Sequence, residues 1–346
     1  MIEYREYGSD FHWIDFEQDL PKYPWIKPCF TGSGRDAIRL LLMFGKTQLG
    51  WKRIWIPTYY CPQVVQAIIS TGIQTKRYND SPISTELLLN QIDFEYNDIL
   101  LLVNYFGMRN MRSISWAAVE SCTVIEDHTH DLVSEWTQNS TAHYCFASLR
   151  KTLPLPDGGV IWSPQSLVLP QEPPLLEYHR IVTELRLQAM HLKTQYLKGV
   201  QIDKEIFLHP QRITEEHIAT NTISGIHPAS LDILKTFPLD TWTRGRRDNY
   251  VFAKAYLTKI QGVSILEPHN CSGYLFSLVI SFTSESLRDL VRSYLISLDI
   301  YPAILWKVEN DSSGFSKTML SIACDARYTI KDMQYVIEKI RNFMKE

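Results

Sequence analysis

Two ionisable side chains come directly after apolar, strand-like stretches of the sequence. Asp127 follows the run at 122–126, and Lys151 follows the run at 143–147. In an open α/β sheet the carboxyl ends of the strands face the ligand crevice. An Asp there can hold a proton on a ring nitrogen or bind a metal ion. A partly desolvated Lys can attack a carbonyl group, because its pKa falls. The plainer alternative is a solvated acidic loop and a surface Lys beside Arg150.

A stretch of small residues leads into an amphipathic helix near the start of the chain. It reads Gly32-Ser33-Gly34-Arg35, followed by a helical pattern at 36–44. Small residues let the backbone approach an anion, and the first turn of a helix offers unpaired N–H groups and the positive end of the helix dipole. The stretch therefore predicts a phosphate-binding turn, with an ordinary helix cap as the alternative. It matches neither a Walker loop nor a GxGxxG fingerprint.

Two histidines beside Asp127 raise the question of a metal site. Asp127, His128 and His130 all carry groups that ligate metals. Adjacent residues at a strand end point to alternate sides, so the three side chains are not expected to converge. We therefore predict no metal. A metal hydrolase built on these residues remains an alternative, and it would leave Lys151 unused.

The first half of the chain alternates strand-like and helix-like patterns, which predicts a doubly wound, mostly parallel α/β sheet. Runs that are apolar on both faces, such as the one at 98–105, are typical of strands buried in a parallel sheet. The expected strands are 53–57, 74–78, 98–105, 122–126, 143–147 and 159–162, and the expected helices are 36–44, 63–71, 84–91 and 113–119.

The pattern changes after residue 162. A Pro-rich loop at 163–174 precedes one long helix at 175–198. The polar stretch at 201–226 is expected to be irregular and functional. Beyond it, helices are expected at 228–237, 240–260, 284–298 and 329–343, and strands at 274–282, 303–306 and 317–322. We place the domain boundary so that 1–237 forms a large domain with an N-terminal segment and 238–346 forms a small C-terminal α+β domain.

Composition argues against several classes of protein. The 346 residues carry 35 Lys and Arg against 38 Asp and Glu, a net charge of −3, which argues against a dedicated nucleic-acid-binding protein. No apolar run approaches the roughly 20 residues that a membrane-spanning helix needs. The acidic, aromatic start is unlike a secretory signal. The six cysteines form no CxxC pair, and several lie in apolar runs, which predicts a reduced, cytoplasmic protein.

The order of the chemical features resembles the DegT-type sugar aminotransferases, a family of fold-type-I pyridoxal-phosphate (PLP) enzymes. A phosphate-binding turn comes first, a strand-end Asp about ninety residues later, and a strand-end Lys 24 residues after the Asp. The segments that carry the resemblance are SGRDAIRLLL, IPTYYCPQVVQAI, VNYFG, VIEDHTH, FASLRKTLPLPDGG and RGRRDNY, with ACDARYT and a terminal helix beyond them. The resemblance implies the fold-type-I PLP transferase architecture, PLP as cofactor, and a homodimer with active sites at the interface.

The resemblance also implies roles for individual residues. Lys151 would form the internal aldimine with PLP and later shuttle a proton. Asp127 would pair with the pyridinium nitrogen, which keeps the ring an electron sink. Gly34 and Arg35 would offer backbone N–H groups to the phosphate, and Ser148 would offer a hydroxyl.

Further cofactor contacts follow from the same resemblance. His130 lies where the family often has Gln or His near the phenolic oxygen of the cofactor. Tyr60 is expected on the face of the ring, with Tyr59 as second choice and two core aromatics as the alternative. Asn221 takes the place of an Asn that reaches the cofactor phosphate of the partner subunit.

The resemblance predicts transfer of an amino group from an amino acid, with glutamate expected, to a keto sugar or sugar nucleotide. The chain departs from the family pattern at two places: Arg35 replaces a small hydroxyl residue, and Ile223 replaces an Arg two residues after the Asn. These departures keep open a non-catalytic or differently reacting relative that acts as a binding or assembly protein. Asp127 and Lys151 favour the enzyme, since packing needs neither.

Overall fold

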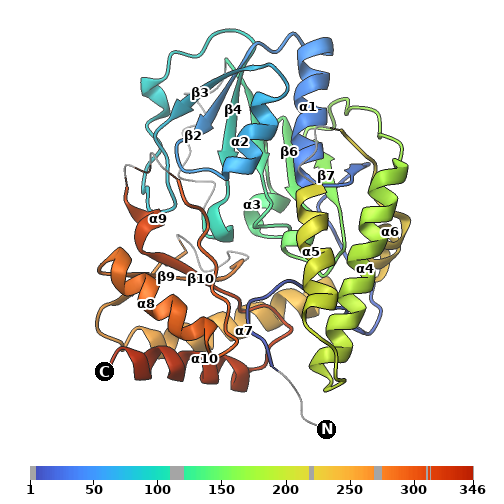
Figure 1. The fold of residues 1–346 in the computed structure, drawn as a ribbon. Coiled ribbons are helices and arrows are strands. Elements are labelled where there is room, and N and C mark those ends of the chain that lie inside the picture. The colour runs from blue at the N-terminus through green and yellow to red at the C-terminus, as the bar shows by residue number, and fades with distance from the viewer. Residues whose placement is uncertain are drawn as a thin grey trace.

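The structure is a computed structural model that describes residues 5–109, 121–217, 222–268, 275–308, 311 and 313–345. A larger unit is built on a seven-stranded sheet and a smaller unit on a three-stranded sheet (Figure 1). The strands of the large sheet are β1 (Cys29–Thr31), β2 (Arg53–Pro57), β3 (Gln74–Tyr78), β4 (Asp98–Val103), β5 (Thr123–Asp127), β6 (Tyr144–Ser148) and β7 (Gly159–Trp162).

The large sheet has the order β1-β7-β6-β5-β4-β2-β3 among the strands described. Strands β2 to β6 pair in parallel, whereas β7 is antiparallel to both of its neighbours. The predicted mostly parallel α/β sheet is therefore confirmed. The helices of this unit are α1 (Gly34–Gln48), α2 (Pro62–Ile69), α3 (Glu135–Gln138), α4 (Glu177–Leu197), α5 (Glu205–His217) and α6 (Pro228–Thr236), with the 3-10 turns η1 (Leu89–Gln91), η2 (Tyr105–Gly107) and η5 (Leu149–Lys151).

Neighbouring side chains of the central strands enter different cores, because a strand points them to opposite faces. In β4, Leu101 belongs to the core that includes α1 and continues into the smaller unit, while Leu102 belongs to the core that includes α3 and α6. In β5, Ile125 lies in the first core and Val124 in the second. This alternation sends residue 127 to one face of the sheet and residue 126 to the other.

The smaller unit packs an antiparallel sheet against helices at the C-terminal end of the chain. Its elements are α7 (Leu239–Leu257), β8 (Val263–Ile265), β9 (Leu278–Phe282), α8 (Glu285–Ile296), α9 (Phe315–Thr318), β10 (Met319–Ile322) and α10 (Ile330–Phe343). Tyr7 pairs with the backbone of Asp299 and Tyr301, so the start of the chain lies against this unit. The boundary between residues 237 and 238 stays a prediction. No helix in the described part of the chain has the length and apolarity to span a membrane.

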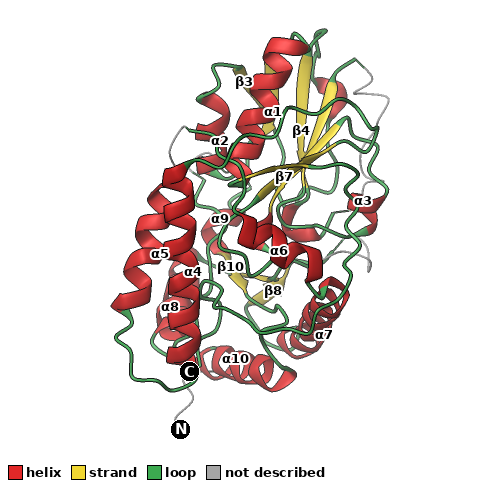
Figure 2. Ribbon diagram, turned by 90° about the vertical axis from the view of Figure 1, so that its right-hand side faces the viewer, coloured by secondary structure: helices red, strands yellow, loops and turns green. Residues whose placement is uncertain are grey.

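The structure corrects three elements of the sequence analysis. The helix expected at 84–91 is reduced to the 3-10 turn η1. The stretch at 201–226, expected to be irregular, contains α5, which packs beside α4 (Figure 2). The buried Phe207 of α5 joins Ala189 and Tyr196 of α4 in a small core, and this tertiary contact stabilises a helix whose pattern is interrupted by Pro210. The strand expected at 303–306 is reduced to a single bridge at Ala303. The helix expected at 113–119 lies outside the described residues.

Candidate active site

A cavity of about 750 Å3 lies at the carboxyl ends of the parallel strands. Asp127 ends β5 and Ser148 ends β6, and these neighbouring strands place Asp127 opposite Phe146. Lys151 follows in the turn η5. Asp127, Ser148 and Lys151 all line the cavity. The structure therefore brings together the strand-end carboxyl group and the amine that the sequence analysis singled out.

The predicted phosphate-binding turn lies against the end of β6. Ser33 caps α1, and its side chain accepts a hydrogen bond from the backbone N–H of Asp36. A Cβ at Gly34 would lie 2.6 Å from the Cβ of Ser148, so only glycine allows this approach. Ser33, Gly34 and Arg35 line the same cavity as Ser148. The helix N-terminus and the Ser148 hydroxyl thus form a candidate anion site.

Lys151 has the electrostatic environment of a reactive amine. Its side chain is exposed within the cavity. The positive charge of Arg150, and then partial desolvation by the protein around the cavity, lower the pKa of Lys151 to about 8, although the charges of Glu215 and Asp10 oppose this. A neutral amine is the nucleophilic form, so this shift makes Lys151 available to attack a carbonyl carbon near neutral pH.

Asp127 is held by a tyrosine beneath the cavity. The Tyr60 hydroxyl donates a hydrogen bond to Oδ2 of Asp127 at 2.6 Å, and the backbone N–H of Thr129 donates to Oδ1 at 2.8 Å. Burial raises the pKa of Asp127, and these two hydrogen bonds oppose the rise. The carboxyl group can therefore exchange a proton with a basic nitrogen placed in the cavity.

The position of Tyr60 differs from the one expected for a residue on the cofactor ring. Its side chain is buried, and the cavity wall at this point is formed by Cys61 and Pro62. Tyr59 is also buried, and its hydroxyl donates to the backbone oxygen of Leu305. Neither ring lines the cavity, and both belong to the hydrophobic core, so the choice between a cofactor-ring contact and two core aromatics stays a prediction.

His130 lies in the cavity wall within a stack of aromatic rings. Its ring centroid is 4.1 Å from that of Phe276, 5.5 Å from that of Phe106 and 5.6 Å from that of Trp306, with small interplanar angles. Burial, with the charges of Lys151 and Arg246, lowers the pKa of His130 to about 3. A neutral imidazole can donate or accept a hydrogen bond without adding charge.

Glu215 is a charged residue of the site that the sequence analysis did not identify. It lines the cavity and accepts hydrogen bonds from Arg150 at 2.8 and 2.7 Å and from Arg35 and Arg186 at 3.4 Å. Burial raises the pKa of Glu215, but the charges of Arg150, Lys151 and the other two arginines outweigh it and place the pKa well below its usual range. Asn221, expected to reach a partner subunit, lies outside the described residues.

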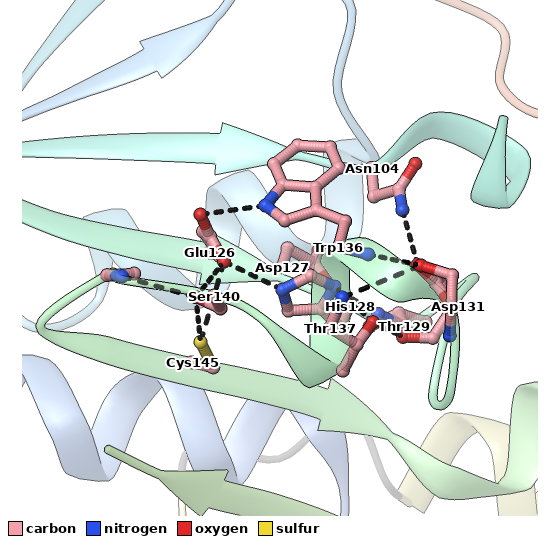
Figure 3. Close-up of polar contacts among 12 residues, drawn as sticks. Asn104, Glu126, Asp127, His128, Thr129, Asp131, Trp136, Thr137, Ser140 and Cys145 are labelled. Carbon is pink, nitrogen blue, oxygen red and sulfur yellow. Dashed lines mark hydrogen bonds and ion pairs between the residues drawn. The ribbon is translucent and has the colours of Figure 1, made fainter. Parts of the chain in front are cut away.

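The reverse face of β5 carries a buried polar network (Figure 3), and its residues Glu126 and His128 do not line the cavity. Nε2 of His128 lies 2.8 Å from Oε2 of Glu126. Burial lowers the pKa of His128, but the hydrogen bond and charge of Glu126 outweigh it and raise the pKa. The groups that complete the network are Trp136 and Ser140, which donate to Glu126 at 2.9 and 2.6 Å, and Thr137, whose hydroxyl lies 3.1 Å from Nδ1 of His128.

Two sets of potential metal ligands occur around β5. In the first set the side chains point to different faces of the sheet. Asp127 contacts Tyr60 on one face, whereas His128 contacts Glu126 on the other, so Asp127, His128 and His130 do not converge. Glu126, His128 and Cys145 bring ligand atoms within 4.8 Å of one another. Because these atoms already share hydrogen bonds, we interpret the second set as a structural network.

Comparisons with known proteins agree with this architecture. No protein-family profile matches the chain, and no curated protein matches it. Among solved structures, the chain is similar to the PLP form of Spr1654 from Streptococcus pneumoniae, assigned as a sugar aminotransferase, with a TM-score of 0.63, 13% identity and 99% of each chain covered. It is also similar to DesV of S. venezuelae in complex with a ketimine intermediate, with a TM-score of 0.60, 14% identity, and 92% of this chain and 85% of DesV covered.

A third structure, DesI in the presence of its TDP-sugar product, matches with a TM-score of 0.62 and 14% identity over 92% of this chain and 81% of DesI. At these identities the likeness establishes the fold. The resemblance to the DegT-type sugar aminotransferases is thus confirmed as a likeness of architecture, and the chain has the fold of the PLP-dependent transferases.

Proposed function

We propose that the protein is a PLP-dependent aminotransferase that moves an amino group from an amino acid, with glutamate as the expected donor, to a keto sugar or sugar nucleotide. One observation carries the proposal: an amine with a lowered pKa and a buried carboxyl group line one cavity beside a helix N-terminus. The solved relatives with this fold include a PLP form, a PMP form and a complex with a TDP-sugar product.

The residues of the cavity fit the proposed cofactor. Gly34 lets the start of α1 approach Ser148, which leaves backbone N–H groups and a hydroxyl for a phosphate. Asp127 would hold the proton of a pyridine nitrogen, and His130 would contact the phenolic oxygen. When bound, PLP supplies an electron sink for the carbanion formed at the substrate carbon.

The protein's own groups would do the remaining work. Lys151 would hold the aldehyde carbon covalently and, once displaced by the donor, would carry a proton between two carbon atoms. Tyr60 would keep Asp127 oriented from below. We also propose a homodimer with Asn221 reaching the partner's phosphate site, and a cytoplasmic location in keeping with the free, mostly buried cysteines of the described residues.

Incubation with PLP tests the proposal. The wild type is expected to become yellow, and borohydride should abolish the visible band and fix the cofactor to Lys151. In a separate sample that has not been reduced, amino acids should convert the band, and the donor is the one that converts it fastest. The Lys151→Ala variant should lose both the fixation and the amino transfer.

Lys193 provides a matched control. Burial lowers its pKa to about 8 as well, but its amine is bound to Ser9 and Asp10. Peptide mapping of the reduced protein should therefore find the cofactor on residue 151 and not on residue 193. A wild type that shows no band would favour the non-catalytic relative, and full activity of Lys151→Ala would refute the assignment.

A further inference from the structure

A second, smaller cavity adjoins the site on the side of the N-terminal segment. It has a volume of about 170 Å3 and shares Arg150 and Lys151 with the larger cavity. Its charged lining contains five cations, Arg150, Lys151, Arg186, Arg246 and Arg327, and two anions, Asp10 and Asp325. Pockets for drug-sized ligands measure about 300–1,000 Å3. The small cavity therefore suits the anionic end of a small molecule rather than a sugar nucleotide.

Two of the arginines in this cavity are engaged by the fold. Arg327 forms a two-point pair with Asp325, at 2.7 and 2.9 Å. Arg246 donates to the backbone oxygens of Thr152 and Phe276. Of these contacts, the one between Arg246 and Thr152 joins the smaller unit to the larger one.

The other two arginines are arranged around a carboxylate. Nη2 of Arg150 donates to both oxygens of Glu215, and Nη1 of Arg186 donates to one of them at 3.4 Å. The Arg150 side chain is 6% exposed, and its Nε finds no hydrogen-bond partner among the described residues. A buried donor without an acceptor costs free energy, so the pair with Glu215 leaves part of the donor capacity of Arg150 unused.

We infer that Arg150 and Arg186 bind the carboxylate of the amino donor, an inference that rests on the proposed amino transfer. The donor must bring its amino group to the place of the Lys151 amine, and its carboxylate is attached to the same carbon. The carboxylate therefore lies next to residue 151, where Arg150 precedes it in the chain and Arg186 lines the adjoining cavity. The larger cavity is left for the cofactor and the sugar.

Glu215, which already accepts hydrogen bonds from both arginines, and Asp10 oppose this binding. Oδ2 of Asp10 lies 3.6 Å from Nη2 of Arg186, and the Asp10 side chain is 55% exposed. A substrate carboxylate near Arg186 would meet the negative charge of Asp10. Removal of that charge should therefore strengthen binding, whereas removal of the Arg186 charge should weaken it.

Calorimetric titration with maleate, a dicarboxylate without an amino group, tests the inference on PLP-loaded and PLP-free protein. Arg186→Gln should weaken maleate binding about tenfold or more, because a charge-assisted hydrogen bond is lost. Arg186→Lys should weaken it less, and Asp10→Asn should tighten it a few-fold. Arg180→Gln is the matched control, since Arg180 lies on the same helix but is 41% exposed and paired with Glu177 and Glu184. In the half-reaction, Arg186→Gln should raise the KM for L-glutamate by a similar factor.

Unchanged maleate affinity in Arg186→Gln would overturn the inference, as would an equal loss in Arg180→Gln. If Arg186→Gln does not fold, unchanged affinities in both Arg186→Lys and Asp10→Asn overturn it. A third result would also overturn the inference. If inorganic phosphate displaces PLP and the Arg186 variants lose PLP, these arginines bind the cofactor phosphate instead of the donor carboxylate. Failure of the proposed function gives a different result. In that case the protein would bind maleate through Arg186 but would never fix PLP, so the carboxylate site would exist without amino transfer.

Discussion

The reactivity of Lys151 depends on the residue before it in the chain. With a pKa of about 8, roughly a quarter of the Lys151 amines are neutral at pH 7.5, against about 0.1% for an ordinary lysine. Attachment of PLP should therefore rise from pH 7 to pH 9 and then level off. The Arg150 charge is the largest cause of the lowered pKa. Arg150→Gln should move the profile upward by about one pH unit, because less repulsion opposes the protonated amine.

Stopped-flow measurement of the visible band at a series of pH values checks this expectation. Arg180→Gln serves as the control, because its guanidinium lies at the surface away from the cavity. A profile in Arg150→Gln that coincides with the wild type would show that the neighbouring charge does not set the reactivity of Lys151.

The pKa of Asp127 depends on the hydroxyl of Tyr60. Tyr60→Phe keeps the buried ring but removes the 2.6 Å hydrogen bond, which opposes the raised pKa of Asp127. The pKa of Asp127 should rise further, and the carboxylate should support a protonated ring nitrogen less well. Turnover should fall about tenfold, the effect of one hydrogen bond to a charged group. Single-turnover rates, with PLP retention measured in parallel, test this.

The comparison of Tyr60→Phe with Tyr60→Ala separates the two roles considered for this residue. If the Phe variant keeps full turnover and the Ala variant loses PLP, the ring and not the hydroxyl is the functional part, as the family resemblance implied. The sequence could place Tyr60 after a strand end, but it could not show which way the backbone turns the ring. It also gave no signal for Glu215, whose site depends on the packing of α5 on α4.

Strand β5 positions the site because its alternation separates reactive from structural groups. Asp127 lines the cavity. Glu126 and His128 form a buried hydrogen-bonded pair on the reverse face of the strand (Figure 3). Breaking a buried charge pair by removing one partner costs about 3–5 kcal/mol. Glu126→Gln should therefore lower the free energy of unfolding by about 3 kcal/mol, whereas Ser140→Ala should cost about 1 kcal/mol.

The pH dependence of this loss has a defined sign. The folded-state pKa of His128 lies above its unfolded value, so the stabilisation is complete below about pH 6.5 and disappears as the pH rises through the folded pKa. Urea unfolding should give a larger difference between wild type and Glu126→Gln at pH 6 than at pH 9. A difference that does not change with pH would mean that His128 is neutral in the folded protein.

The strands of the large sheet from β2 to β7 were predictable to within one or two residues. The runs at 53–57, 74–78 and 159–162 match β2, β3 and β7. The three-residue strands β1 and β8 are too short to carry a pattern and were missed. The sequence indicated that Asp127 and Lys151 each follow the end of a strand. Their meeting at one cavity follows from strand pairing, which the sequence could only imply.

At the scale of the molecule, the cavity lies where the large sheet meets the smaller unit. Asp127 and Lys151 come from the large unit, whereas Phe276 and Trp306 come from the segments around β9 and before β10. A relative movement of the two units would therefore change the cavity wall opposite Lys151. The site belongs to the assembled chain rather than to either sheet.

Assembly beyond one chain is the remaining whole-molecule question, and complementation can answer it. If Asn221 acts on the partner's site in a symmetric dimer, Lys151→Ala and Asn221→Ala should each be weakly active alone. A heterodimer of the two variants contains one site with both defects and one site with none. After complete subunit exchange, half of the dimers are mixed, so about a quarter of wild-type activity should return. Light scattering should give twice the 40.2 kDa chain mass. A mixture that stays inactive while it exchanges subunits would place Asn221 in its own subunit's site, whereas full activity of Asn221→Ala alone would place it outside any site.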